Sequence, residues 1–120
     1  MPTTPRLPLV VLSLTAALLS ACGTRGSGEL LTDTRELDAF HEIEMGGALD
    51  LIVHVGAEQK VVVSGDDNIV SKIETRVSGG KLHIDHDGLL RPDLPLQVEV
   101  WVPTLAAVEA SGATDIDEIG

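Results

Sequence analysis

The sequence is poor in the residues that most often build stacking platforms and covalent cross-links. It has one cysteine, one tryptophan, one phenylalanine and no tyrosine in 120 residues. A single cysteine cannot form an internal disulfide, and the scarcity of aromatic rings weighs against carbohydrate binding by ring stacking. Eight basic residues face 19 acidic ones, which gives a formal net charge of −11 and argues against nucleic acid as a partner.

The sequence also lacks an apolar run long enough for a transmembrane helix. The longest run, residues 7–19, follows Arg6 and contains no charged residue. A helix that spans the hydrocarbon core needs about 20 apolar residues. A short basic region followed by an apolar stretch of this length is typical of a secretory signal peptide. We therefore predict a helical signal peptide over residues 1–21.

The end of this segment resembles a bacterial lipobox. The residues Leu19-Ser20-Ala21-Cys22 place small side chains before the only cysteine, and the resemblance implies cleavage before Cys22 and a lipid on its thiol. The acyl chains of such a lipid would anchor the protein in the membrane. Gly23 after the cysteine, where an Asp favours inner-membrane retention, favours the outer membrane. The alternative is ordinary cleavage after Ala21, which would leave a free thiol.

The 99 residues that would remain after cleavage suit one modest domain. Residues 22–34 are mostly small and polar without a sustained period, and we predict that they form a lipidated flexible tether. About ten flexible residues would give it a reach of roughly 17 Å. Residues 35–120 are then left for a single β domain.

Apolar residues in residues 35–120 alternate with polar ones, the period of half-buried strands. Leu49, Leu51 and Val53 are predicted to share one strand face with Val55. The same alternation places Leu82 and Ile84 opposite Lys81, His83 and Asp85, and it places Leu96, Val98, Val100 and Val102 opposite Gln97, Glu99 and Trp101. Glycine-rich and Asp-rich turns separate these segments. The fold class is therefore all-β, with one short helical turn between Asp67 and Ile73.

A weak internal repeat is present in three segments that begin with a small-residue pair, at residues 46–51, 79–84 and 111–116. Their second glycines lie 33 and 32 residues apart, a period typical of stacked solenoid units. Chance similarity among glycine-bounded strands is the alternative. If the repeats stack in register, Asp50, His83 and Asp115 would form an outward column that could bind a cation or respond to pH.

The order of motifs resembles the family of auto-transporter adhesins with a head GIN domain. The motifs are Phe40-His41-Glu42-Ile43 with Gly46-Gly47, Leu51-Ile52-Val53, Val63-Ser64-Gly65-Asp66-Asp67-Asn68, Gly80-Lys81-Leu82-His83-Ile84, Val98 to Leu105 and Val108 to Ala113. The resemblance implies short stacked strands in a single-sheet solenoid or right-handed β-helix-like domain. Because family domains continue beyond the last motif, we expect the domain to be incomplete, with an open edge at residues 116–120.

The residues give little support for catalysis. No nucleophile elbow surrounds Ser64 or Ser111, and neither a phosphate loop nor a dinucleotide fingerprint is present. The ligand types in residues 83–88 include His83 and Asp85, but alternation points them away from His86. We therefore predict no enzyme activity, no cofactor and no metal site. Trp101 could be a contact point, although packing under a loop is its more common role.

These observations favour a non-catalytic cell-envelope lipoprotein, with Cys22 as its lipid attachment site and a β domain that acts as an adhesin or binding module. Its expected partners are the membrane, through the lipid, and an envelope or cell-surface protein. The alternative is a structural or envelope-signalling lipoprotein that acts through partner proteins.

Overall fold

The computed structural model describes residues 23–47 and 49–118. The predicted signal peptide and its lipid site Cys22 lie outside the described residues. The elements are β1 (Thr24–Arg25), β2 (Leu30–Arg35), β3 (Glu42–Met45), β4 (Asp50–Val55), β5 (Lys60–Asp66), α2 (Asp67–Val70), β6 (Ile73–Ser78), β7 (Lys81–His86), β8 (Leu90–Arg91), β9 (Gln97–Val102), β10 (Ala107–Ala110) and β11 (Thr114–Glu118). No helix within the described ranges is long and apolar enough to cross a membrane.

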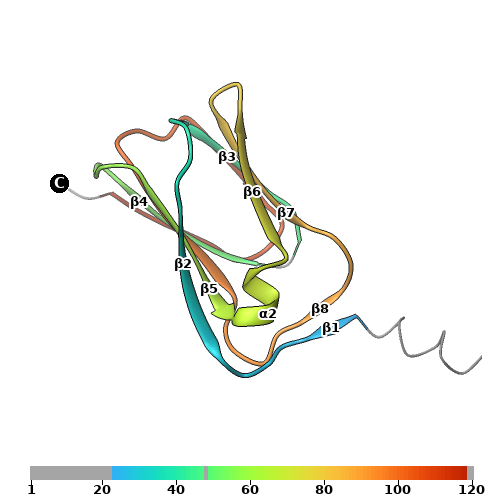
Figure 1. The fold of residues 1–120 in the computed structure, drawn as a ribbon. Helices are drawn as coiled ribbons and strands as arrows, with labels where there is room; N and C mark the ends of the chain where they lie inside the picture. The colour runs from blue at the N-terminus through green and yellow to red at the C-terminus, as the bar shows by residue number, and fades with distance from the viewer. Residues whose placement is uncertain (1–22, 48, 119–120) are drawn as a thin grey trace, which may run out of the picture.

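The strands of the described residues form three sheets (Figure 1). A four-stranded sheet has the order β10-β3-β7-β6, a five-stranded sheet has the order β11-β4-β9-β5-β2, and β1 pairs with β8. The all-β prediction is confirmed, and the predicted helical turn is present as α2. The prediction of a single sheet is wrong. Three times the chain runs along the four-stranded sheet and then turns a corner into the five-stranded sheet, and we call each such run a pass. The passes place β3, β7 and β10 in the four-stranded sheet and β4, β9 and β11 in the five-stranded sheet.

The three passes stack in the same order in both large sheets, through parallel pairing. Ile43 is the register partner of Leu82 in the four-stranded sheet, and Val53 is the partner of Val100 in the five-stranded sheet. Because in-register partners point to the same side, their apolar side chains form continuous inner rows. The core holds Phe40, Ile43, Met45, Leu49, Leu51, Val53, Val61, Val63, Ile69, Val70, Ile73, Leu82, Ile84, Leu96, Val98, Val100 and Val102.

Antiparallel strands complete each sheet on one side. The β6–β7 hairpin turns at Gly79 and Gly80, whose φ angles are +60° and +73°. Positive φ at both central residues is the requirement of the tight turn that matches strand twist, and glycine meets it without strain. In the five-stranded sheet, β5 pairs with β9 and β2 pairs with β5. The opposite edges, among the described residues, are β10 and β11, where Ile116 is 46% exposed.

The three repeats do not all stack in one column, because the middle one takes a different place in the fold. The repeats at 46–51 and 111–116 both turn the corner into the five-stranded sheet, where β11 pairs with β4. At this corner a Cβ on Gly112 would lie 2.0 Å from the carbonyl oxygen of Leu49, so the close approach requires glycine. Residues 79–84 instead form the hairpin of the other sheet. His83 therefore neighbours Glu44 and shares no column with Asp50 or Asp115.

Much of the segment for which the sequence predicts a flexible tether is paired with the rest of the domain. Thr24 and Arg25 form β1, which pairs in parallel with β8, and Leu30–Arg35 form β2 at the edge of the five-stranded sheet. Small and polar residues gave no apolar period here because β2 is an edge strand with mainly exposed side chains. Its order comes from main-chain pairing with β5, which lies about 30 residues away in the chain.

A buried carboxylate joins this N-terminal segment to the rest of the fold. Asp66, at the junction of β5 and α2, is fully buried and accepts hydrogen bonds from the backbone N–H groups of Gly28 (2.8 Å), Asp93 (3.0 Å) and Leu94 (3.1 Å). Burial by itself raises the pKa of a carboxyl group. Here the backbone N–H donors, led by that of Leu94, outweigh burial and hold the pKa of Asp66 below its ordinary value of 3.8.

A second contact joins the two large sheets at the side where β2 and β6 are edge strands. The guanidinium of Arg35, on β2, donates to the carbonyl oxygens of Ile73 (2.9 Å) and Val70 (3.1 Å), and to the hydroxyl of Thr75 on β6 (3.1 Å). The carboxylate of Asp33 accepts a further hydrogen bond from Nε of Arg35, at 2.5 Å. Since Arg35 bonds β2 of one sheet to β6 of the other, it fixes the distance between their edges.

Replacing Asp66 with Asn should destabilise the fold and reduce its sensitivity to acid. The amide offers a donor where the backbone already supplies donors, so at least one N–H group would lose its acceptor. Because the folded-state pKa of Asp66 is lowered, its ionised form stabilises the fold fully above pH 3.8 and progressively less as the pH falls through the folded-state value. Urea unfolding between about pH 6 and about pH 3 measures both effects.

In that experiment the difference in unfolding free energy between the wild type and Asp66→Asn should shrink as the pH falls. Asp67→Asn is the matched control, because Asp67 is the next acidic residue but is only half buried. A difference that stays constant with pH would contradict the assigned role of Asp66.

Candidate functional site

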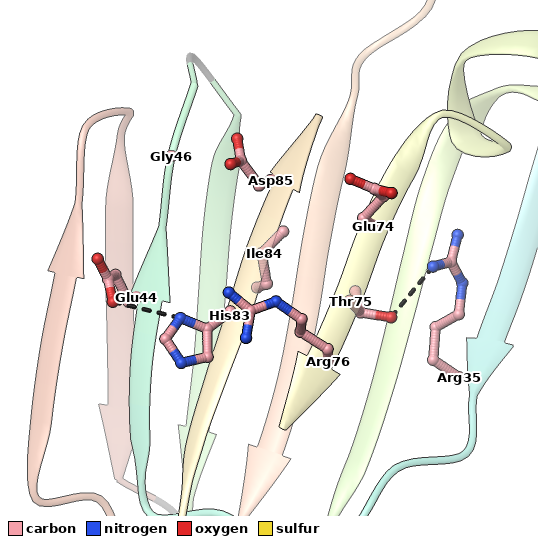
Figure 2. A pocket seen from close by; sticks show the side chains of 9 residues that line it. All are labelled: Arg35, Glu44, Gly46, Glu74, Thr75, Arg76, His83, Ile84 and Asp85. Carbon is pink, nitrogen blue, oxygen red and sulfur yellow. Dashed lines mark hydrogen bonds and ion pairs between the residues drawn. The ribbon is translucent and has the colours of Figure 1, made fainter. Parts of the chain in front are cut away.

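An open groove of about 670 Å³ lies at the four-stranded sheet. We call it the sheet groove, and Figure 2 shows the side chains that line it. Its lining residues are Arg35, Glu44, Gly46, Glu74, Thr75, Arg76, His83, Ile84 and Asp85. They come from β3 and the glycine that follows it, from β6 and β7, and from the end of β2, so the groove exists only where these elements meet.

Strand alternation and register bring the charged side chains of the groove together. Along β6 and β7, every second residue faces outward, because the intervening residues fill the core. Glu44 on β3 is the register partner of His83 on β7, and His83 is in turn the partner of Arg76 on β6. One step along the strands, Asp85 is the partner of Glu74. The predicted outward orientation of His83 and Asp85 is confirmed.

Polar contacts link Glu44 on β3 to two side chains of β7. The Nδ1 atom of His83 lies 3.3 Å from Oε2 of Glu44, and Nζ of Lys81 lies 3.9 Å from the same oxygen. Figure 2 shows the side chain of Arg76 extending across β7 towards His83 and Glu44. Arg76 itself forms no ion pair with a described residue. Its guanidinium donors are thus available to an incoming carboxylate.

The groove offers binding groups of both charges and little chemistry. Three carboxylates (Glu44, Glu74, Asp85) lie with two guanidinium groups (Arg35, Arg76) and an imidazole (His83). The lining contains neither serine nor cysteine, and the hydroxyl of Thr75 accepts a hydrogen bond from Arg35. Within residues 23–47 and 49–118, no group of three metal-ligand side chains is close enough to hold an ion. The arrangement can recognise charged groups on a ligand.

A second cluster lies on the outer face of the five-stranded sheet, around the only tryptophan. The ring of Trp101 stacks on that of His54, with centroids 5.0 Å apart and planes inclined by 24°. Nζ of Lys60 lies 5.4 Å from the Trp101 ring centroid, and Glu99 pairs with His54 at 2.6 Å. Trp101 therefore packs between strand neighbours rather than under a loop, and this half-buried ring is already in contact with its own chain.

Sequence reasoning found His83 and Asp85 but missed the other charged residues of the groove. Glu44 alternates with Ile43 and Met45, a period-two signal that could have placed it on an outward face. Nothing local to the sequence indicates that Glu44 would lie beside His83, because that pairing joins strands almost 40 residues apart. The contacts of Arg35 with Ile73 and Thr75 could not be predicted for the same reason, because these residues lie 38 and 40 positions further along the sequence.

The stack between His54 and Trp101 should couple their effects on stability. In a double-mutant cycle with His54→Ala and Trp101→Leu, we expect an interaction free energy of about 0.5–1.5 kcal/mol, the range for aromatic pairs. Urea unfolding of the four proteins gives this value. Lys81→Ala combined with Trp101→Leu is the control, because Lys81 lies on the other sheet and should be additive within about 0.5 kcal/mol. Additivity of the His54 pair would show that the stack contributes nothing.

Solved structures of similar fold come from Bacteroides and Parabacteroides species. A putative adhesin from Bacteroides fragilis matches with a TM-score of 0.70 and 22% identity over 78% of this chain and 45% of that one. A putative adhesin from Parabacteroides merdae matches with a TM-score of 0.68 and 19% identity over 79% of this chain and 41% of that one. A putative lipid binding protein from Parabacteroides distasonis matches with a TM-score of 0.64 and 20% identity over 78% of this chain and 42% of that one. The chain thus spans less than half the length of these proteins, and the likeness shows a shared fold.

No curated protein sequence matches the chain. The family model described as "Putative auto-transporter adhesin, head GIN domain" matches residues 39–120. This match covers the four-stranded sheet completely and most of the five-stranded sheet. It starts after β2, so Arg35 lies outside the matched region. The chain belongs to this head GIN domain family.

Proposed function

We propose that this protein is a non-catalytic cell-envelope lipoprotein whose β domain binds an envelope or cell-surface protein through the sheet groove. Family membership supports an adhesin-like role at the cell surface. The choice of this surface rests on Glu44, His83 and Arg76, which are register partners on three paired strands. Together these side chains present groups of both charges to a ligand. Residues on paired strands lose little further freedom on binding.

The partner proposed is a polypeptide segment with charges of both signs. The carboxylates of Glu74 and Asp85 suit lysine or arginine side chains. The guanidinium of Arg76, which pairs with no described acidic residue, suits a carboxylate. Nucleic acid fits poorly, because a chain with a net charge of −11 would repel the phosphate backbone of a nucleic acid. Contacts in so open a groove are partly solvated, so salt should weaken them.

The lipid on Cys22 is the second part of the proposal. Support comes from the sequence Leu19-Ser20-Ala21-Cys22, which follows an apolar run of signal-peptide length. Two or three acyl chains would hold the protein on the membrane for its lifetime. Gly23 favours the outer membrane as the place of display.

Intact-mass analysis of the membrane fraction from native expression tests the anchor. We expect a mass that corresponds to cleavage before Cys22 plus acyl chains, and we expect Cys22→Ser to lose both the added mass and the membrane association. Ser27→Ala is the control, because it replaces a nearby hydroxyl residue without touching the lipobox. An unmodified protein in the soluble fraction would contradict the anchor.

Photo-crosslinking in cells tests the groove. A photoreactive residue placed at Glu74 should form an adduct with one envelope or surface protein, and the added substitution Arg76→Glu should reduce the yield several-fold by removing the cation and repelling a carboxylate. Lys60→Glu is the matched control, since it makes the same charge change on the other sheet. An adduct yield that Arg76→Glu leaves unchanged would contradict the groove as the contact surface.

The identity of the cross-linked protein also separates two roles for the same groove. A surface protein of a neighbouring cell or host would support adhesion. A regulator within the same envelope would support a signalling lipoprotein instead.

A further inference from the structure

The ribbon of β1 and β8 places the start of the described chain firmly on the domain. Thr24 is the register partner of Leu90, and Arg25 is the partner of Arg91, in parallel pairing. The N–H of Thr24 donates to the carbonyl oxygen of Leu89, and the N–H of Gly26 donates to that of Arg91, both at 2.9 Å. In Figure 1 this ribbon lies at the end of the domain away from the tip of the β6–β7 hairpin.

The two faces of this ribbon differ in character. Leu90 points inward and packs against the core. The residues on either side of it point outward by strand alternation, so Leu89 and Arg91 share the outer face with Arg25. Leu89 is 60% exposed, and both arginines are exposed as well. An apolar side chain thus lies beside two cations on one small surface.

This outer face lacks a partner within the described part of the chain. Neither Arg25 nor Arg91 forms an ion pair with a described residue. Like charges directly opposite each other on paired strands destabilise the pair. The clustering is unusual in a chain with 19 acidic residues and only eight basic ones. Asp87 and Asp93 flank β8 in the sequence, so the patch has acidic neighbours that limit its positive field.

The position of the patch in the chain indicates what covers it. Cys22, the proposed lipid site, comes two residues before Thr24, and consecutive Cα atoms are 3.8 Å apart, so the Cα atom of Cys22 can lie no more than about 7 Å from that of Thr24. The flexible tether expected from the sequence would have allowed roughly 17 Å. A lipid on Cys22 therefore brings the β1–β8 ribbon to the membrane surface.

We propose that the outer face of the β1–β8 ribbon is a membrane-contact surface, on which the domain rests against anionic phospholipid headgroups. Arg25 and Arg91 bind phosphate groups, and Leu89 enters the boundary between headgroups and acyl chains. This inference rests on the proposed lipid anchor and adds a fixed orientation to it. The contact holds the end with β1 and β8 against the lipid and directs the β6–β7 hairpin away from it.

The test uses the acylated full-length product reconstituted into vesicles with about one third phosphatidylglycerol in phosphatidylcholine. Leu89→Cys carries a nitroxide label, and Ser78→Cys, at the hairpin, carries the same label as the control. The native cysteine does not react, because acylation occupies its thiol. We expect the label at position 89 to be several-fold less accessible to a water-soluble paramagnetic reagent than the label at position 78.

The charge contribution is measured by adding Arg25→Gln and Arg91→Gln to the Leu89→Cys protein. Each arginine near an anionic surface shifts the ratio of docked to undocked domain by about fivefold, so most of the protection at position 89 should be lost. Lys60→Gln with Lys81→Gln makes the same charge change on the two large sheets and should leave the protection in place. Vesicles of pure phosphatidylcholine should show weaker protection in the unsubstituted protein.

The outcomes separate this inference from the anchor. A protein without acyl chains that does not associate with vesicles would overturn the anchor and the contact surface together. An acylated, vesicle-bound protein whose labels at 89 and 78 are equally accessible would overturn the contact surface alone. Protection that is unchanged when both arginines are replaced would overturn the role assigned to the cations.

Discussion

The structure depends on the burial of one carboxylate, that of Asp66. Three backbone N–H groups from two distant segments converge on it, one from the chain before β2 and two from the loop before β9. An isolated buried charge would be costly, but one that accepts several charge-assisted hydrogen bonds can hold its neighbours in place. Asp66 thereby fixes the loop from which the chain enters β9, the strand at the centre of the five-stranded sheet.

The connection between the two large sheets passes through this contact. The chain leaves β7 in the four-stranded sheet, passes through β8 and enters β9 in the other sheet, and the loop between β8 and β9 is the one that Asp66 holds. Arg35 forms hydrogen bonds that join β2, an edge strand of the five-stranded sheet, to β6, an edge strand of the four-stranded sheet. The other charged side chains of the groove are carried on β3, β7 and β6, whose spacing is set by main-chain pairing within one sheet.

The same contacts connect the proposed membrane surface to the proposed binding surface. Gly28, which donates to Asp66, lies in the short segment between β1 and β2, and so the β1–β8 ribbon is coupled to the core by a direct hydrogen bond. In a domain held in this way, the orientation of the proposed membrane end determines the direction in which the groove faces. A ten-residue flexible tether would have left that orientation free.

The sequence by itself determined which side chains of each strand face inward. Alternation placed Leu51, Val53, Val98 and Val100 in the core and sent His83 and Asp85 outward, because a strand presents successive side chains to opposite faces. It also located the glycine turns and the single helical turn of α2. These are local properties, and a window of a few residues contains the physical information that fixes them.

Only the tertiary structure decided which strands are neighbours. His83 lies beside Glu44 and Arg76 rather than in a column with Asp50 and Asp115, and residues 30–35 form a strand although their own sequence carries no apolar period. Main-chain hydrogen bonds between strands are nearly independent of side-chain identity, so a local pattern cannot specify the partner. The groove, the ordered N-terminal segment and the buried Asp66 arise from long-range pairing, which only the packing of the complete core selects.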